Sequence, residues 1–167
     1  MNIPKLFEGA IATTIRDHAV LTKLPRVRTW QQIDADFSWT ETSDRVFPLI
    51  DIRATPEVVG GEGVTLMSNV SLLMATMAND DPKHKVVSDI YEAVSTVLAS
   101  LYSQFRTNVA GAERETFNKY IADTQPDAET IISVGGFEWG EPLTPYEDSG
   151  ANFIGINFNI HFSRTDY

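Results

Sequence analysis

One run of alternating residues, Val64 to Ala78, constrains the fold of this chain more than any other segment. It reads VTLMSNVSLLMATMA, with apolar side chains at every second position over most of its length. A period of two places those side chains on one face of a β-strand. At about 3.3 Å per residue the strand spans roughly 50 Å, well beyond the usual strand of about five or six residues. We therefore expect one long strand with at least one end projecting from the domain body.

Two amphipathic helices are predicted. The first covers residues 4–21, and the second follows the long strand with Asp81 as its N-cap and Pro82 in its first turn. The second helix carries a broad apolar stripe at spacings of three and four: Val86, Val87, Ile90, Tyr91, Val94, Val97, Leu98, Leu101, Tyr102 and Phe105.

Further strands are predicted at Arg26–Trp30, Arg45–Ala54 and Thr130–Val134, the last ending in a bulge or bend at Gly135–Gly136. The final strand has the strictest alternation. Its apolar face holds Ile154, Ile156, Phe158, Ile160 and Phe162, and its polar face holds Asn157, Asn159 and His161. This pattern is typical of a sheet with one packed face.

The polar stretches 31–44 and 142–150 are expected to be loops or turns, and residues 107–128 a surface insertion with a short helix near 113–121. The order of elements predicts an α+β fold of two layers. In it, a mostly antiparallel sheet of four to five strands carries two main helices on one face. We expect residues 1–167 to form a single domain.

Composition excludes several functions. The chain has no cysteine, so disulfides, thiolate zinc sites and cysteine nucleophiles are impossible. It shows no secretion signal and no membrane-spanning apolar stretch, so a soluble protein without membrane contact is expected. The net charge of −10 is uneven, with +3 in residues 1–30 and −13 in the remainder. Tight nucleic-acid binding is not expected from such a surface, whereas solubility alone is a sufficient reason for the acidity.

No motif indicates catalysis. The three histidines have no ligand-like spacing, and the acidic pairs Asp34/Asp36, Asp80/Asp81 and Glu147/Asp148 lack the further oxygen ligands that a cation site needs. The glycines at 60–63 precede a strand and fit a hairpin tip better than a phosphate loop. We therefore expect no metal, no cofactor and no enzymatic activity.

The segments RVFPLIDIRATPEVV, VTLMSNVSLLMATMA, DDPKHKVVSDIYEAVSTVLASLY and FIGINFNIHFSRTDY, in this order after an amphipathic helix, resemble bacteriophage tail terminator proteins, also called tail completion proteins. The resemblance implies a noncatalytic virion protein, assembled in the host cytoplasm, that forms a ring, expected to be a hexamer. Such a ring caps the tail tube, stops its polymerisation and joins the tail to the neck or connector. DNA would pass through its lumen without specific binding.

Ring contacts require complementary opposite surfaces. The uneven charge suggests that Arg16, Arg26 and Arg28 meet Glu57 and Glu62 of a neighbour, and the strand end from Val58 and Val59 to Leu66 is the expected contact region. The stripe of Asn157, Asn159 and His161 is a further candidate, although a solvated sheet face explains it equally well. The alternatives are another neck or head completion protein and, from a different class, a small cytoplasmic ligand-binding domain or enzyme.

Overall fold

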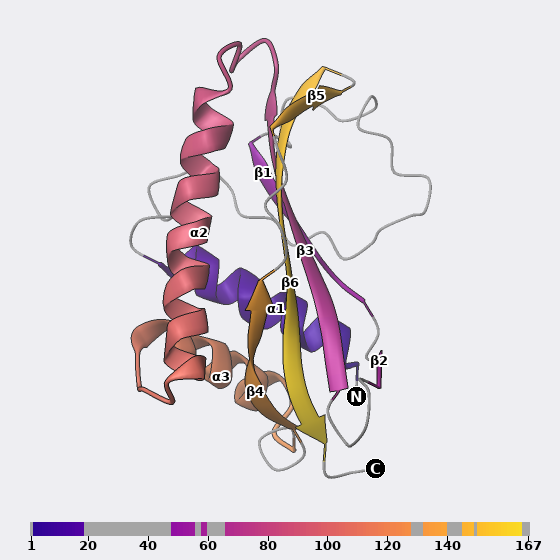
Figure 1. Ribbon diagram of the computed structural model, residues 1–167, viewed down its shortest axis with the longest axis vertical. Helices are drawn as coiled ribbons and strands as arrows, with labels where there is room; N and C mark the ends of the chain where they lie inside the picture. Colours follow the sequence, from indigo (N-terminus) through magenta and orange to yellow (C-terminus); the bar gives the residue numbers. More distant parts are fainter. Residues whose placement is uncertain are drawn as a thin grey trace.

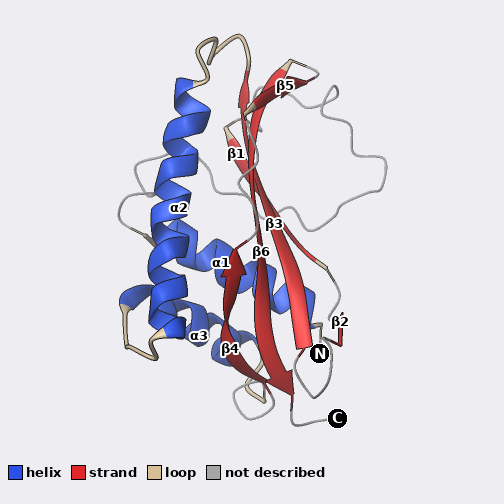
Figure 2. Cartoon of the chain, viewed as in Figure 1, coloured by secondary structure: helices blue, strands red, loops and turns tan. Residues whose placement is uncertain are grey.

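The computed structural model describes residues 2–18, 48–55, 58–59, 66–127, 132–139, 145–148 and 150–164. These residues form an α+β fold in which a long antiparallel sheet carries helices on one face (Figures 1 and 2). The helices are α1 (Ile3–Asp17), α2 (Lys85–Arg106) and α3 (Ala112–Thr124). The strands are β1 (Leu49–Ala54), β2 (Val58–Val59), β3 (Leu66–Met77), β4 (Ile132–Trp139), β5 (Tyr146–Asp148) and β6 (Ala151–Arg164).

The sheet is built around one long ladder. Its strand order is β1-β3-β6-β4, with β2 pairing beside β1 on β3 and β5 pairing beside β4 on β6. β3 and β6 run antiparallel from the Leu66↔Phe162 pair to the Met77↔Ala151 pair without a shift in register. The predicted long strand is thus confirmed over Leu66–Met77, and Figure 1 shows β3 and β6 running nearly the whole length of the molecule.

The expected projecting tip, at residues 55–63, lies largely outside the described residues, so only the strand end beside it can be examined. Leu66, at the outer end of β3, is only 2% exposed, and Val59 pairs with it in the sheet. This end of β3 therefore belongs to the domain body, because its side chain is needed in the core. Residues 60–65 lie outside the described residues.

Alternation along the strands decides which side chains enter the main core. Every second residue of β1, β3 and β6 points toward the helices and meets their apolar stripes, as the sequence predicts. The core side chains of these three strands are Ile50, Ile52, Leu66, Val70, Leu72, Met74, Ile154, Ile156, Phe158, Ile160 and Phe162.

The start of α2 differs from the prediction. The helix begins at Lys85, after His84 in a left-handed conformation with φ 58°, and not at Pro82. Asp81 still caps the start of α2, because its carboxylate accepts hydrogen bonds from the N–H groups of Val86 at 2.9 Å and Val87 at 3.0 Å. The expected capping side chain is therefore correct, but it reaches the helix across a turn.

Residues 112–124 are not a surface insertion. They form α3, whose Phe117 is fully buried and whose ring lies 5.4 Å from Phe105 and 6.3 Å from Phe7 between centroids. Gly9 of α1 allows close approach, since a Cβ there would lie 2.0 Å from the Tyr120 hydroxyl. Only two of the residues of α3, Phe117 and Ile121, are buried, and two such positions form too weak a pattern to predict this packing.

Other boundaries shift modestly. The first helix covers Ile3–Asp17 and not 4–21, and the strand predicted at Arg45–Ala54 is described as Leu49–Ala54. The bulge predicted near Gly135–Gly136 is confirmed by a register shift between Val134 and Gly136. The short strand β5 occupies part of the predicted 142–150 turn. The predicted strand Arg26–Trp30 and the 31–44 loop lie outside the described residues.

Candidate assembly surface

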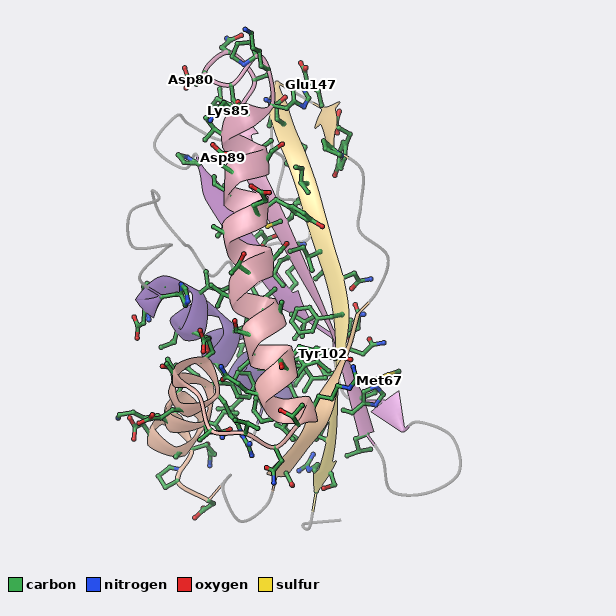
Figure 3. The ribbon with its side chains drawn as sticks, turned by 60° about the vertical axis from the view of Figure 1, so that its left-hand side comes forward. Met67, Asp80, Lys85, Asp89, Tyr102 and Glu147 are labelled. Atoms are coloured by element: carbon green, nitrogen blue, oxygen red, sulfur yellow. The ribbon has the colours of Figure 1, made fainter. Side chains whose placement is uncertain are left out.

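The face of the sheet turned away from the helices is the most distinctive surface of the described chain, and we call it the outer sheet face. Its central part carries Asn69 and Ser71 of β3 opposite Asn159 and Asn157 of β6, and all four side chains are partly or largely exposed. His161 follows on the same face, opposite Met67. Figure 3 shows Met67 beside the sheet on the side away from α2. The shared face of Asn157, Asn159 and His161 is thus confirmed, and their role in assembly stays a prediction.

Hydrogen bonds between strands hold these polar side chains in place. The Asn69 Nδ2 donates to Asn159 Oδ1 at 2.8 Å, and the Ser71 hydroxyl donates to Asn157 Oδ1 at 3.2 Å. Cross-strand pairs of this kind stabilise a sheet by roughly 0.2–1 kcal/mol each. The outer sheet face therefore presents an ordered ladder of amide and hydroxyl groups, with little conformational entropy left to lose on contact.

A pocket of about 270 Å³ opens beside this ladder, lined in part by Asp51, Arg53, Ser71 and Asn157. Arg53 donates from Nε to Asp51 Oδ2 at 2.8 Å. Asp51 is only 5% exposed, and its other oxygen, Oδ1, is buried without a hydrogen-bond partner. Burial raises the pKa of Asp51, and the neighbouring Arg53 opposes that rise. A buried carboxylate oxygen without a protein donor is costly.

A second buried acid, Glu8, lies beside the end of β1. Glu8 of α1 accepts the backbone N–H of Ala54 at 2.8 Å and so fixes α1 against β1. Burial raises the pKa of Glu8, the Ala54 hydrogen bond opposes the rise, and the negative charge of Asp51 adds to it. Two buried acids therefore lie beside β1, and the positive charges of Lys5 and Arg53 oppose the rise in the pKa of Glu8.

The end of the outer sheet face near Leu49 and Phe153 is apolar and buried. The sequence predicted that only the face toward the helices would be packed. Leu49, Ala75, Ala151 and Phe153 form a second buried cluster there. Tyr146 of β5 stacks on Phe153 with 5.2 Å between ring centroids and remains 45% exposed. Beyond this cluster, the end of the molecule where β3 turns into α2 bears Asp80, Lys85 and Glu147 (Figure 3).

The structure separates the predicted interface residues. Arg16 lies in the last turn of α1, with its side chain 63% exposed and its Nε 3.8 Å from the Asp17 carboxylate. Val58 and Val59 form β2 at the edge of the sheet, where Val58 pairs with Met67. Arg26, Arg28, Glu57 and Glu62 lie outside the described residues, so their proposed pairing stays a prediction.

The alternation of the long strand already places Asn69 and Ser71 on its polar side, but sequence reasoning assigned no role in the candidate surface to them or to Asp51 and Arg53. The signal was present in β1, where Asp51 lies between Ile50 and Ile52. Alternation alone places it on the face opposite to those two core residues. Neither its burial nor its unpaired oxygen could be read from the sequence, because both depend on the packing around it.

Within the described ranges, no three His, Asp or Glu side chains are grouped so that they could hold a metal ion. None of the described helices is both long and apolar enough to cross a membrane. The chain matches no protein-family model, and no curated protein matches it.

Proposed function

We propose that this protein is a structural virion assembly protein of the tail terminator type. It forms a ring that caps the tail tube, stops tube polymerisation and offers a surface to the neck. The observation that carries this proposal is the outer sheet face, on which an ordered amide and hydroxyl ladder adjoins a pocket with an unpaired, buried carboxylate oxygen.

Ring formation needs two different surfaces on each subunit, because a head-to-tail contact joins unlike patches. The sheet supplies one such surface, and the end of α1 that carries Arg16, in the helical layer on the opposite side, supplies the other (Figure 2). Polar side chains already fixed by hydrogen bonds favour association, since binding then orders few further groups. The arrangement supports a subunit that contacts its neighbours through opposite sides.

The β3–β6 ladder supports the same role mechanically. Its twelve consecutive pairs, from Leu66↔Phe162 to Met77↔Ala151, form one continuous antiparallel plate. Such a continuous pair of strands transmits a force applied at one end of the subunit to the other end with little local deformation. That property suits a ring that bears on a tube at one side and on a neck at the other.

The charge of the chain fits the expected passage of DNA. A net charge of −10 gives a ring of several copies a strongly negative field, which repels phosphate and prevents DNA from adhering to the lumen. The same charge makes copies repel one another, so the ring contacts must bring opposite charges together.

The test combines light scattering of the purified protein with negative-stain microscopy of tails from the same source. We expect rings, either free or at tail ends, and copurification with the tail tube protein. Copurification with portal-side proteins alone would favour the head completion alternative. A stable monomer that binds no tails would contradict the proposal.

Two matched substitutions make that test specific. Ser71→Lys places a charge on the exposed outer sheet face, whereas Thr96→Lys places the same charge on the exposed side of α2. We expect the first substitution to abolish tail binding and the second to leave it unchanged. Equal effects would mean that the outer sheet face is not the contact surface.

A further inference from the structure

We propose that the pocket lined by Arg53, Ser71 and Asn157 is a carboxylate-binding site, and that it receives an aspartate or glutamate side chain from a second copy of this chain. This inference rests on the ring-forming part of the proposed function. It adds the chemistry that one subunit must present to the outer sheet face of the next.

The pocket lies along one cross-strand row of the outer sheet face. The register places Arg53 of β1 opposite Ser71 of β3, and Ser71 opposite Asn157 of β6. Leu73 and Ile156 add an apolar lining. The volume of about 270 Å³ is just below the range of about 300–1,000 Å³ that is usual for small-molecule sites. A space of this size suits one side chain better than a cofactor.

Arg53 is the group that a partner meets in this pocket. Its side chain is 45% exposed, whereas Asp51 is only 5% exposed. The Arg53 Nε donates to Asp51 Oδ2 at 2.8 Å, so a buried carboxylate fixes one corner of the guanidinium. Among the described residues, none accepts a hydrogen bond from the terminal nitrogens of Arg53. The guanidinium therefore offers oriented N–H donors at the surface, and its planar fork matches the two oxygens of a carboxylate.

Asn157 adds a second donor. The Ser71 hydroxyl donates to Asn157 Oδ1 at 3.2 Å, so the oxygen of the amide is engaged within the sheet and the Nδ2 group keeps its donors. A pocket whose accessible polar groups are mainly donors selects a ligand that only accepts, and an ionised carboxylate has this property. Because Arg53 is a cation, its hydrogen bonds to such a ligand are roughly twice as strong as neutral ones.

The charge of the chain indicates that the carboxylate comes from another copy. With 23 acidic against 13 basic residues, copies repel one another unless a carboxylate of one meets a cation of the next. Asp17 at the end of α1, Glu92 on α2 and Glu115 on α3 are all exposed. They belong to the helical layer, on the opposite side of the sheet from Arg53 (Figure 2). Acids on one side and a fixed cation on the other are the unlike, complementary surfaces that a head-to-tail contact requires.

The principal test is Asn157→Asp, which puts a negative charge in the pocket without changing the size of the side chain. The new carboxylate can still accept the Ser71 hydroxyl, so the ladder is preserved. Asn118→Asp makes the same change at an exposed position of α3 and is the matched control. In sedimentation velocity over a concentration series, we expect Asn157→Asp to weaken self-association by roughly tenfold or more, because like charges at a contact repel. Asn118→Asp should associate as the wild type does.

A double variant, Asp51→Asn with Arg53→Gln, tests the cation itself. Removing Arg53 alone would leave the buried Asp51 carboxylate without its partner and would lower stability. The neutral pair avoids that penalty, and thermal unfolding checks that the double variant folds. We expect it to lose self-association by a similar factor.

Salt provides a readout of charge rather than shape. Raising the ionic strength should narrow the difference in self-association between Asn157→Asp and the wild type, since screening weakens the repulsion between carboxylates. A difference that salt does not narrow would overturn the inference, because the pocket would then act through its shape.

The remaining outcomes separate this inference from the proposed function. If the wild type associates and Asn157→Asp or the folded double variant associates equally well, the inference is overturned and the terminator proposal stands. A wild type that caps tails but stays monomeric in solution also overturns the inference alone, because a second copy would then not fill the pocket. A wild type that neither associates nor binds tails contradicts both.

Discussion

Replacing Asp81 with alanine is expected to lower the free energy of unfolding by about 3 kcal/mol. The Asp81 carboxylate, which is 3% exposed, accepts three hydrogen bonds that join β3 to α2. The donors are the N–H groups of Val86 and Val87, at 2.9 and 3.0 Å, and the hydroxyl of Thr76, at 2.8 Å. Alanine removes the acceptor and leaves all three donors behind.

The magnitude follows from where those donors lie. Loss of a helix-capping side chain costs about 1 kcal/mol, which accounts for the Val86 and Val87 groups at the start of the helix. The Thr76 hydroxyl is buried, and a buried polar group without its partner costs about 1–3 kcal/mol. The two contributions together give about 3 kcal/mol.

Urea unfolding followed by circular dichroism measures this loss as a lower midpoint at unchanged slope. The matched control is Asp80→Ala, which removes an exposed carboxylate from the same turn and should change stability by less than about 0.5 kcal/mol. Equal midpoints for the two variants would refute the account of the turn.

The pH dependence of the same pair of variants provides a second check. Burial alone raises the pKa of Asp81, but the hydrogen bonds from Val86, Val87 and Thr76 outweigh it and hold that pKa below its ordinary value. A depressed pKa contributes stability above the pKa of the unfolded state, and the contribution is lost as the pH falls through the folded pKa. The difference between wild type and Asp81→Ala should therefore be full at neutral pH and shrink in strong acid.

Three further predictions concern α3, Glu8 and the outer sheet face. Phe117→Ala should lower the free energy of unfolding by about 3–5 kcal/mol in urea titrations, whereas Val109→Ala, at a 55% exposed position, should change it by less than about 0.5 kcal/mol. Glu8→Gln should be more stable than wild type at neutral pH, because a raised carboxyl pKa costs stability as the pH rises. That gain should vanish below the ordinary glutamate pKa, and exposed Glu115→Gln should show no gain. Asn159→Ala should lower stability by at most about 1 kcal/mol yet measurably weaken tail binding in pull-down assays.

The fold was predictable where one strong period governs a long segment. β6 alternates strictly from Ile154 to Phe162, and α2 carries its apolar stripe over most of its length, so both follow from side-chain spacing alone. The short helix predicted near 113–121 is confirmed by α3, but its burial was not predictable from spacing. Its burial depends on Phe117 meeting rings from α1, α2 and β4, and such a meeting is set by tertiary packing and not by local pattern.

Part of the candidate site was also predictable. Alternation places Asn157, Asn159 and His161 on one face, and the register of β3 then adds Asn69 and Ser71. The Asp51 pocket is of a different kind, because an unpaired carboxylate oxygen becomes visible only when every neighbouring donor has been placed. A missing hydrogen-bond partner can be found only when the positions of all neighbouring donors are known from a structure.

The central claim is that this chain ends the growth of a tail tube, and the most direct measurement is the length of polymerising tubes. Tail tube protein from the same source would be polymerised with and without the chain, and tube lengths and ends would be recorded by electron microscopy. We predict shorter tubes that carry one ring at an end, with Thr96→Lys as active as wild type and Ser71→Lys inactive. Tubes of unchanged length with bare ends would contradict the account.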